Sequence, residues 1–450
     1  SLGLDKPVLT QYALYMEGLA HGDMGVSIRT QMPVSGELAR YFPATLELTL
    51  AAMVIAVVFG IFLGVLSAVH RDSWVDHICR VISMVGVSIP LFWSGVVCLI
   101  LFYKVIPAFP ASGRLDTFLT PPPQVTGLYV IDGLIAGNMD VVISAIHHLL
   151  LPALCLAYAQ LAIISRQVRS GMVDVLEQDY IRTAKACGIP LRRIIYRYAL
   201  KNALIPTVTI TGLTIGELLG GAVITETIFG WPGMGKYVMD SIAYLDFPAI
   251  MGFTLVVSVG YVVINMAVDM IYNILNPQIS GEMTTAKAEE IREERESFFH
   301  KSLDILLTNK LTLAGMVIVA LIILLGILAP LISPWDPNLM NVAGRLQAPS
   351  IHHFFGTDEM GRDIFSRILY GARISITVGL SIVIIAAVIG VAIGSLSGWC
   401  GGRVDRVIMA VTDMILSFPS MVLALALTAA LGVGLFNTML AVCIVRIPLY

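Results

Sequence analysis

The segment YIRTAKACGIPLRRIIYRYALKNALIP, residues 180–206, is a basic island between two apolar stretches that are each long enough to cross a bilayer. Gly188 and Pro190 divide it in the middle, because glycine frees the backbone and proline at a helix start loses no hydrogen bond. Apolar residues recur at helical spacing on both sides of this break, at Ile181, Ala184 and Cys187 and again at Ile194, Ile195 and Tyr198. The pattern predicts two short helices joined at an elbow, which a cytoplasmic partner could grip.

The composition around this elbow is that of a polytopic membrane protein. The 450 residues are 57% hydrophobic and 13% charged, and their mean hydropathy is +0.84. A helix needs about 20 apolar residues to cross the hydrocarbon core of a bilayer. The fold class is therefore all-α, and Pro90 is expected to kink the second of its spans. We expect nine spans, the last incomplete, at residues 46–69, 79–109, 141–164, 203–229, 249–275, 311–332, 374–396, 407–431 and 437–450.

The distribution of basic residues sets the orientation of these spans. Eight Lys and Arg residues lie between Arg166 and Lys201, against three carboxylates. The positive-inside rule places this part of the chain in the cytoplasm. Counting spans outward from there puts residues 1–41 and 111–140 on the outer side. We expect a multi-pass protein of a bacterial or archaeal inner (plasma) membrane.

Several classes of function find no support in the residues. The net charge is −3 and no basic stripe stands apart from the membrane-flanking positions, which argues against nucleic acid as a partner. The six cysteines are scattered, and the adjacent His147 and His148 point about 100° apart on a helix, so we expect no metal and no other cofactor. Neither a GxxxxGK[ST] phosphate loop nor a nucleophile elbow occurs in the sequence. We therefore expect no catalytic residue and no ATP hydrolysis by this chain.

The second half of the chain repeats features of the first half in the same order. A glycine pair, a Val-Asp pair and a Ser-x-Pro triplet recur at an almost constant offset, which predicts two homologous units of parallel topology. The matching residues are Gly60 and Gly64 with Gly390 and Gly394, Val75-Asp76 with Val404-Asp405, and Ser88-Ile89-Pro90 with Ser417-Phe418-Pro419. We expect a first unit at residues 1–280, which contains the elbow at 177–206, and a second at 311–450. A charged cytoplasmic linker at 281–310 is expected to end in an amphipathic helix on the membrane surface.

The elbow resembles the coupling loop of importer-type ABC transporter permeases, in the variant typical of the dipeptide, oligopeptide and nickel uptake branch. Ala184, Gly188 and Leu200 match the general pattern, and Arg-Thr-Ala with Ala-Leu-Lys-Asn-Ala-Leu-Ile-Pro matches the variant. The resemblance implies that the elbow docks into a groove of an ABC ATPase subunit, which would hydrolyse the ATP. The residues that it assigns to this contact are Arg182, Thr183, Ala184, Gly188, Pro190, Tyr198 and Leu200.

Two further segments resemble outer parts of the same permeases. ETIFGWPGMG (residues 226–235) is similar to a segment of the first dipeptide permease subunit, and FGTDEMGRDIFSRILYGARIS (355–375) is similar to one of the second. The resemblance implies that a periplasmic or extracellular substrate-binding protein delivers a peptide to this face. Asp358, Arg362 and Asp363 form a mixed-charge surface suited to such docking. A solvated loop that serves only to stay outside the bilayer is an equal alternative.

The resemblance covers nearly the whole chain, and it implies a fusion of two permease subunits. The opening span of the first subunit and the coupling loop of the second are missing from the resemblance, so we expect truncation at both ends. Only one elbow would then engage an ATPase.

Glu217 is an ionisable residue inside the fourth apolar stretch, among Gly212, Gly216 and Gly220. Such a group is costly in a membrane, so we expect it to face a water-filled cavity or a partner. A direct role with a peptide amino group and a purely structural pairing remain open. Close helix packing and a moving contact in gating remain open for the three glycines.

The sequence therefore predicts the permease of an ATP-driven importer of dipeptides or oligopeptides, with ATPase subunits, a binding protein and membrane lipid as partners. Nickel or another small solute is the alternative substrate within this class. An ion-driven secondary transporter would show inverted repeats and several buried acidic or histidine relays, which the parallel repeat does not favour. A membrane enzyme would need a catalytic dyad at membrane depth, and none stands out.

Overall fold

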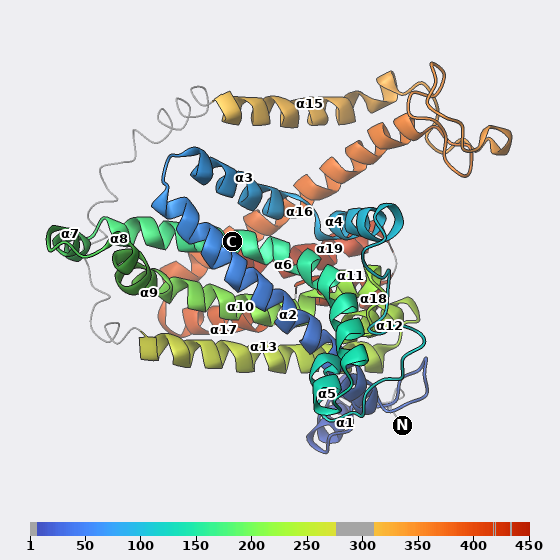
Figure 1. The fold of residues 1–450 in the computed structure, drawn as a ribbon. Helices are drawn as coiled ribbons and strands as arrows, with labels where there is room; N and C mark the ends of the chain where they lie inside the picture. Colours follow the sequence, from blue (N-terminus) through green and yellow to red (C-terminus); the bar gives the residue numbers. More distant parts are fainter. Residues whose placement is uncertain (1–6, 276–309, 417, 419, 433) are drawn as a thin grey trace. The chain divides into compact units, whose positions relative to one another are not determined.

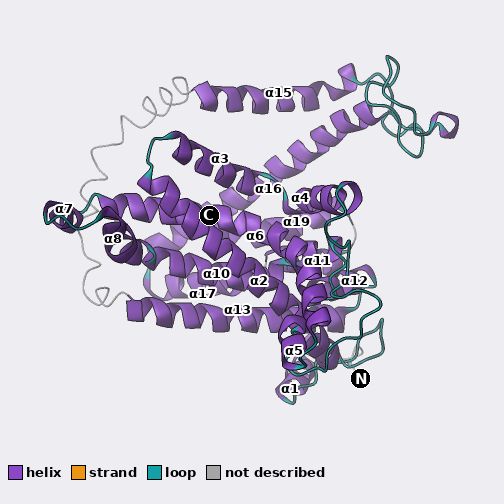
Figure 2. Ribbon diagram, viewed as in Figure 1, coloured by secondary structure: helices purple, strands orange, loops and turns teal. Residues whose placement is uncertain are grey.

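The computed structural model describes residues 7–275, 310–416, 418, 420–432 and 434–450, which confirms the predicted all-α class (Figure 2). Within these residues the extended segments form only isolated bridges, Val26 with Pro33 and Thr357 with Asp363. The chain separates into two compact units, and each is described by itself. Unit 1 comprises Ser1–Ile279 with Val411–Val433, and unit 2 comprises Ser280–Ala410 with Gly434–Tyr450. The linker predicted at residues 281–310 lies outside the described residues, apart from residue 310.

Unit 1 is a bundle of helices of very different lengths (Figure 1). Its first half contains α1 (Val8–Ala20), α2 (Val34–Val69), α3 (Trp74–Ser88), α4 (Leu91–Leu99), the π-helix η1 (Ile100–Val105), α5 (Tyr129–Ile135) and α6 (Met139–Leu176). The elbow follows as α7 (Asp179–Ala186), α8 (Leu191–Arg193), the π-helix η2 (Ile194–Ala199) and α9 (Leu200–Ala203). It leads into α10 (Ile205–Gly221), α11 (Val223–Ile228), α12 (Met234–Ala243) and α13 (Phe247–Leu275).

The long helices α2 and α6 form the centre of unit 1. They approach closely where α2 carries glycine, because a Cβ built on Gly64 would lie 2.7 Å from Val168 Cβ and 2.8 Å from the Ser165 carbonyl oxygen. Gly60 faces Ile164 in the same way. Backbone contact of this kind requires residues without a side chain. The first glycine pair of the repeat therefore serves close helix packing.

The second apolar run is bent far more sharply than a kink. The helices α3 and α4 meet at 101°. Ile89 between them has φ −87° and ψ 125°, an extended conformation, because the ring of Pro90 disfavours the helical region for the residue before it. Pro90 itself lies at the N-terminus of α4. The position of the break agrees with the prediction, and its size makes this segment a bent pair of helices.

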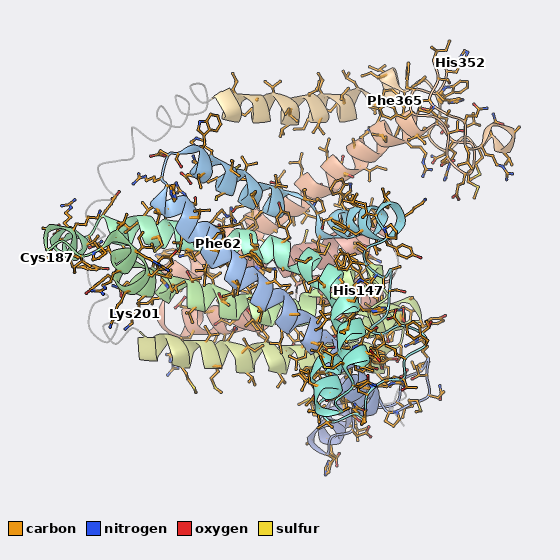
Figure 3. All side chains as sticks on the ribbon, viewed as in Figure 1. Phe62, His147, Cys187, Lys201, His352 and Phe365 are labelled. Carbon is orange, nitrogen blue, oxygen red and sulfur yellow. The ribbon has the colours of Figure 1, made fainter. Side chains whose placement is uncertain are left out.

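The two ends of unit 1 differ in composition. The N-terminal segment, the loop after η1, α5 and α12 gather at one end, where α2 begins, and the basic elbow lies at the opposite end (Figure 1). His147 lies toward the first end, and Cys187 and Lys201 lie on the elbow (Figure 3). The segments predicted to lie on the outer side are thus at the end opposite the elbow, and their side of the membrane stays a prediction.

Unit 2 is built around the long helix α16 (Ile364–Cys400), which packs on α15 (Lys310–Ile332) and on α19 (Leu435–Arg446). A short 3-10 helix η4 (Val342–Gly344) lies in the loop between α15 and α16, and η5 (Ile447–Leu449) follows α19. A Cβ on Gly390 would lie 2.7 Å from the Ile447 carbonyl oxygen and from Tyr450 Cβ. Gly60 of unit 1 meets the Leu161 carbonyl oxygen and Ile164 in a similar way. The internal repeat itself stays a prediction. The helix α17 (Gly402–Leu416) begins in unit 2 and ends in the part of the chain assigned to unit 1, and α18 (Ser420–Leu431) belongs to unit 1.

The number of long apolar helices is smaller than the nine predicted spans. Five helices of the described part are long and apolar enough to cross a membrane, or six if the bent pair α3–η1 is one span. The fourth predicted span, residues 203–229, is divided into α9, α10 and α11, and 407–431 is divided between α17 and α18. Hydropathy measures apolar length and does not reveal such breaks, so the count of nine stays a prediction.

Candidate functional site

The elbow turns where the sequence predicts, at Gly188 and Pro190. The helix α7 ends at Ala186, and Gly188 follows with φ +73°, a left-handed conformation that favours glycine. The backbone N–H of Gly188 donates to Lys185 O (3.0 Å) and that of Ile189 donates to Ala184 O (3.2 Å), which satisfies carbonyls at the helix end. Pro190 then precedes α8. A Cβ on Gly188 would meet nothing within 4 Å, so the turn projects into open space.

The apolar side of the elbow anchors it to the core of unit 1. Ile181 and Ile194 are buried, and both belong to the same core cluster as Val168 and Met172 of α6. Ala184 is also buried, so it supports the elbow from within rather than lying on its outer surface. The predicted apolar face is therefore confirmed at four of its six positions, since Ile195 is buried as well.

Two elbow positions correct the predicted face. Cys187 and Tyr198 are exposed, although the helical spacing placed both among the buried residues. The reason for Cys187 is that α7 ends one residue before it. Tyr198 lies in η2, whose π-helical winding shifts the periodicity that the sequence pattern assumed.

The exposed side of the elbow is strongly basic. Of the residues assigned to the coupling contact, Arg182, Thr183, Gly188, Pro190 and Tyr198 are exposed, and Leu200 is half-buried. The other exposed basic residues of the elbow are Lys185, Arg192, Arg193, Arg197 and Lys201. The carboxylate of Asp179 is 3.2 Å from Arg182, and both side chains are exposed. The surface is thus suited to an acidic or carbonyl-lined groove on a partner.

An ion pair that the sequence did not reveal ties α6, the helix that precedes the elbow, to the first turn of α3. Asp76 is fully buried, and Arg169 of α6 donates to both of its carboxylate oxygens at 2.9 Å. Ser67 at the end of α2 donates to the same carboxylate (2.5 Å). Unit 2 repeats half of this arrangement, because Ser397 donates to Asp405 (2.6 Å). The recurring Val-Asp pair marked Asp76 in the sequence, but only the fold could identify Arg169 as the partner of Asp76.

A second buried ion pair organises the opposite end of unit 1. Glu47 of α2 and Arg114 of the following outer loop pair with side chains that are each 7% exposed. Glu47 also accepts the backbone N–H of Val130 (2.9 Å), and Arg114 donates to Gly127 O (3.0 Å) and stacks over Tyr129 at 3.6 Å. A lone acid in an apolar run and a lone base in an outer loop were the only signals in the sequence.

The GWPG turn is held against α2 by buried polar groups. Trp231 Nε1 donates to Ala44 O (2.8 Å), and Thr45 donates to the carboxylate of the fully buried Glu226 (2.6 Å). A Cβ on Gly233 or Gly235 would overlap the Glu226 carboxylate, which explains both glycines. The segment similar to dipeptide permeases is therefore a packed structural turn.

Asp132 caps a tight turn in the outer loop and gives it a defined pH dependence. Burial opposes ionisation, but hydrogen bonds from the Thr126 hydroxyl and from the backbone N–H groups of Thr126, Gly127 and Val125 outweigh it and lower the pKa of Asp132. A carboxyl whose folded pKa is depressed stabilises the fold above its unfolded pKa of about 3.9, and this contribution is lost as pH falls through the folded pKa.

We expect amide exchange at Val125–Gly127, corrected for intrinsic rates, to accelerate as the pH falls below about 4. Asp132→Asn should accelerate it at pH 7 and abolish the acid dependence. Protection that is equal in both proteins at every pH would contradict this role.

The predicted docking residues of unit 2 have different surroundings. Asp358 accepts Arg362 Nε (2.8 Å) and also pairs with Arg367; although desolvation opposes it, hydrogen bonding from Arg362 lowers the pKa of Asp358 to about 2. Asp363 is buried and caps α16 by accepting Ser366 N (2.8 Å), and His353 pairs with it. Asp363 is therefore a helix cap, which corrects its placement on an exposed docking surface.

The other candidate residues are Glu217, the glycines of α10 and the adjacent histidines. Glu217 lies in α10, but the surroundings of its side chain and of Gly216 and Gly220 are outside the described part. Gly212 lies against Val268 of α13, so its contact is close helix packing. His147 and His148 contact the carbonyl oxygens of Ala108 and Ser144, respectively. In the described residues no group of three or more His, Cys, Asp and Glu side chains could hold a metal ion.

Comparison with known proteins identifies two matching families. Residues 60–281 match "Binding-protein-dependent transport system inner membrane component", and residues 297–349 match "N-terminal TM domain of oligopeptide transport permease C". The inward-facing structure of the MetNI methionine ABC transporter is similar at a TM-score of 0.40 and 17% identity, over 53% of this chain and 96% of that chain.

Three curated proteins illustrate the relatives. The probable D,D-dipeptide transport system permease protein DdpB of Escherichia coli (strain K12) is 51% identical over 278 residues, which are 62% of this chain and 82% of that protein. The dipeptide transport system permease protein DppB of the same strain is 42% identical over 280 residues (62% and 83%). The glutathione transport system permease protein GsiC of Pectobacterium atrosepticum is 36% identical over 278 residues (62% and 81%). The chain therefore belongs to the binding-protein-dependent transport system inner membrane component family, the multi-pass inner-membrane permeases of ABC importers.

Proposed function

We propose that this chain is the permease of an ATP-driven importer of dipeptides. The proposal is supported by the 51% and 42% identity to permeases whose names specify dipeptide transport. The chain forms part of the translocation path, and ATP is hydrolysed on separate ABC ATPase subunits. A substrate-binding protein delivers the peptide to the outer face of the membrane. In unit 1 we assign α5 and α12 to this face, and in unit 2 the surface around Asp358 and Arg362.

The elbow carries the coupling part of this proposal. Its turn at Gly188 is exposed, basic and open to a partner, while Ile181 and Ile194 hold it rigidly against α6. A partner that moves this surface would move the end of α6, and Arg169 would pass the motion to Asp76 at the α2–α3 turn. Coupling through a contiguous packed network of this kind needs no flexible segment.

The two halves of the chain are proposed to be homologous permease units, at residues 1–280 and 311–450. The matches at 60–281 and 297–349 and the Ser67–Asp76 and Ser397–Asp405 hydrogen bonds support this division. Glu217 is proposed to face the translocation path, in keeping with the cost of an ionisable group in a membrane.

The elbow assignment is tested with two isosteric substitutions at one position. Asn and Asp both tolerate the left-handed conformation, so Gly188→Asn and Gly188→Asp should fold and insert alike. We expect Gly188→Asp to lose at least about 90% of ATPase-subunit capture and of ATP-dependent dipeptide uptake in cells, because one like-charge contact at a docking surface costs several kcal/mol. Gly188→Asn should keep most of both.

Equal capture and uptake by both variants would refute the elbow as the ATPase contact. Capture that depends on Gly188 without dipeptide uptake, but with uptake of nickel ion in the same cells, would keep the importer and refute the dipeptide substrate.

A further inference from the structure

A cavity of about 330 Å³ lies beside the Asp76–Arg169 pair, between α2, α3 and α6. Three arginines line it, Arg80 from α3 and Arg166 and Arg169 from α6, and four of the other lining residues are serines. Ser83 and Ser165 are buried there, so their hydroxyl groups lie inside the wall of the cavity. Guanidinium and hydroxyl groups are the donors that proteins use for phosphate.

The charges in this cavity do not balance within the described residues. Asp76 is the carboxylate beside it, and Arg169 already occupies both of its oxygens. Arg80 lies 3.6 Å from the same carboxylate, and Arg166 has no hydrogen bond or ion pair in the described part of the chain. Among the described residues, the three arginines that line the cavity therefore share the single buried carboxylate of Asp76. Asp72 also acts on Arg169, but it is paired with Arg71.

The position of the cavity relative to the membrane indicates where an anion would come from. Ser67 is two residues from the end of α2, and Arg169 is close to the elbow, so the cavity lies at the elbow end of unit 1, which the positive-inside rule places on the cytoplasmic side. Beyond Arg80, α3 exposes the apolar side chains of Val81, Ile82 and Val85. A cavity lined by arginines, bordered by exposed apolar surface and placed at the end of membrane-spanning helices, has the composition of a lipid-headgroup site.

We propose that this cavity binds a phosphate group, supplied by an anionic phospholipid of the cytoplasmic leaflet. Arg80 and Arg166 donate to the phosphate oxygens, Ser170 adds a hydroxyl donor, and the acyl chains follow the apolar face of α3. The Ser83 hydroxyl already donates to the Cys79 carbonyl oxygen (3.0 Å) and only borders the site. The aliphatic stems of the two arginines and Met84 cover the glycerol region. Arg169 remains paired with Asp76, so lipid binding does not compete with the link between α3 and α6.

The test is native mass spectrometry of the purified, delipidated chain with phosphatidylglycerol, phosphatidylcholine or inorganic phosphate. The variant is Arg80→Gln/Arg166→Gln, and the control is Arg192→Gln/Arg193→Gln on the elbow, which removes the same charge outside the cavity. We expect the first variant to weaken phosphatidylglycerol binding about a hundredfold, because each of the two lost charged hydrogen bonds accounts for about a factor of ten. The control variant should bind within about twofold of the wild type.

Each outcome decides the proposal. Phosphatidylglycerol binding that requires the two cavity arginines supports the lipid as the source. Binding of inorganic phosphate alone, with the same requirement, supports the phosphate site and assigns it to a soluble anion. Equal losses in both variants, equal binding of phosphatidylcholine, or binding unaffected by either variant would overturn the site. Both arginines are exposed, so an unchanged unfolding midpoint without lipid verifies that the variants fold.

Discussion

Arg114→Met is expected to lower the free energy of unfolding of unit 1 by about 3–5 kcal/mol, because it leaves the Glu47 carboxylate buried without a counter-charge. Both side chains are 7% exposed, so water cannot replace the guanidinium. Among the described residues, Glu47 then keeps the N–H of Val130 as its one donor for a full negative charge. The midpoint of thermal unfolding in detergent should fall by roughly 6–20 °C, at about 2–4 °C per kcal/mol.

The control is the double variant Glu47→Gln/Arg114→Met, in which no charge remains to be buried. Replacing both members of a buried pair by neutral side chains is often close to neutral, so most of the lost stability should return. A remaining deficit of about 1 kcal/mol is expected from the lost stacking of Arg114 on Tyr129. If the single and double variants unfold at the same temperature, the pair is not the reason for the loss.

Gly64→Leu is expected to have the second largest effect, a destabilisation of at least about 3 kcal/mol, at the upper end of the range for overpacking. The new Cβ would lie 2.8 Å from the Ser165 carbonyl oxygen, a backbone atom of α6 that cannot rotate away. The helices α2 and α6 must therefore separate, and their contact along the centre of unit 1 is lost. Thermal unfolding and the yield of monodisperse protein would measure the change.

Gly379→Leu in α16 is the matched control for this substitution. It makes the same chemical change in a helix of similar length, but its Cβ meets nothing within 4 Å. We expect its unfolding midpoint to stay within about 2 °C of the wild type, since leucine also favours the helix over glycine. Comparable losses at both positions would show that the cost comes from the residue type and not from the helix contact.

The backbone preferences of single glycine and proline residues predicted the breaks between helices that depend only on neighbouring residues. Gly188 and Pro190 end and restart the elbow helices, and Pro90 breaks the second apolar run, because these residues restrict the backbone wherever they occur. The 101° angle between α3 and α4 was beyond such rules, since packing on α2 and α6 sets it. The outward turn of Tyr198 was likewise hidden by the π-helical winding of η2.

The polar contacts that organise unit 1 could not be paired from the sequence. Glu47 and Arg114 are 67 residues apart, and Asp76 and Arg169 are 93 residues apart. A single sequence marks such residues only as charges in unexpected surroundings, and any one of several partners would satisfy them. The same limit applies to Asp363, because its role as a helix cap depends on where α16 begins.

The 93-residue separation of Asp76 and Arg169 has a consequence for the order of assembly during synthesis. At about 5–20 residues per second, a ribosome needs roughly 5–20 s to proceed from one partner to the other. During this interval Asp76 is held by Ser67 and by the backbone N–H of Asp72, all within one helical hairpin. The hairpin can therefore remain at the membrane surface while part of the hydrogen-bonding capacity of the Asp76 carboxylate is already used. Synthesis of α6 then supplies Arg169, which completes the pair with Asp76 just before the elbow leaves the ribosome. The docking surface is therefore made after the helices that support it.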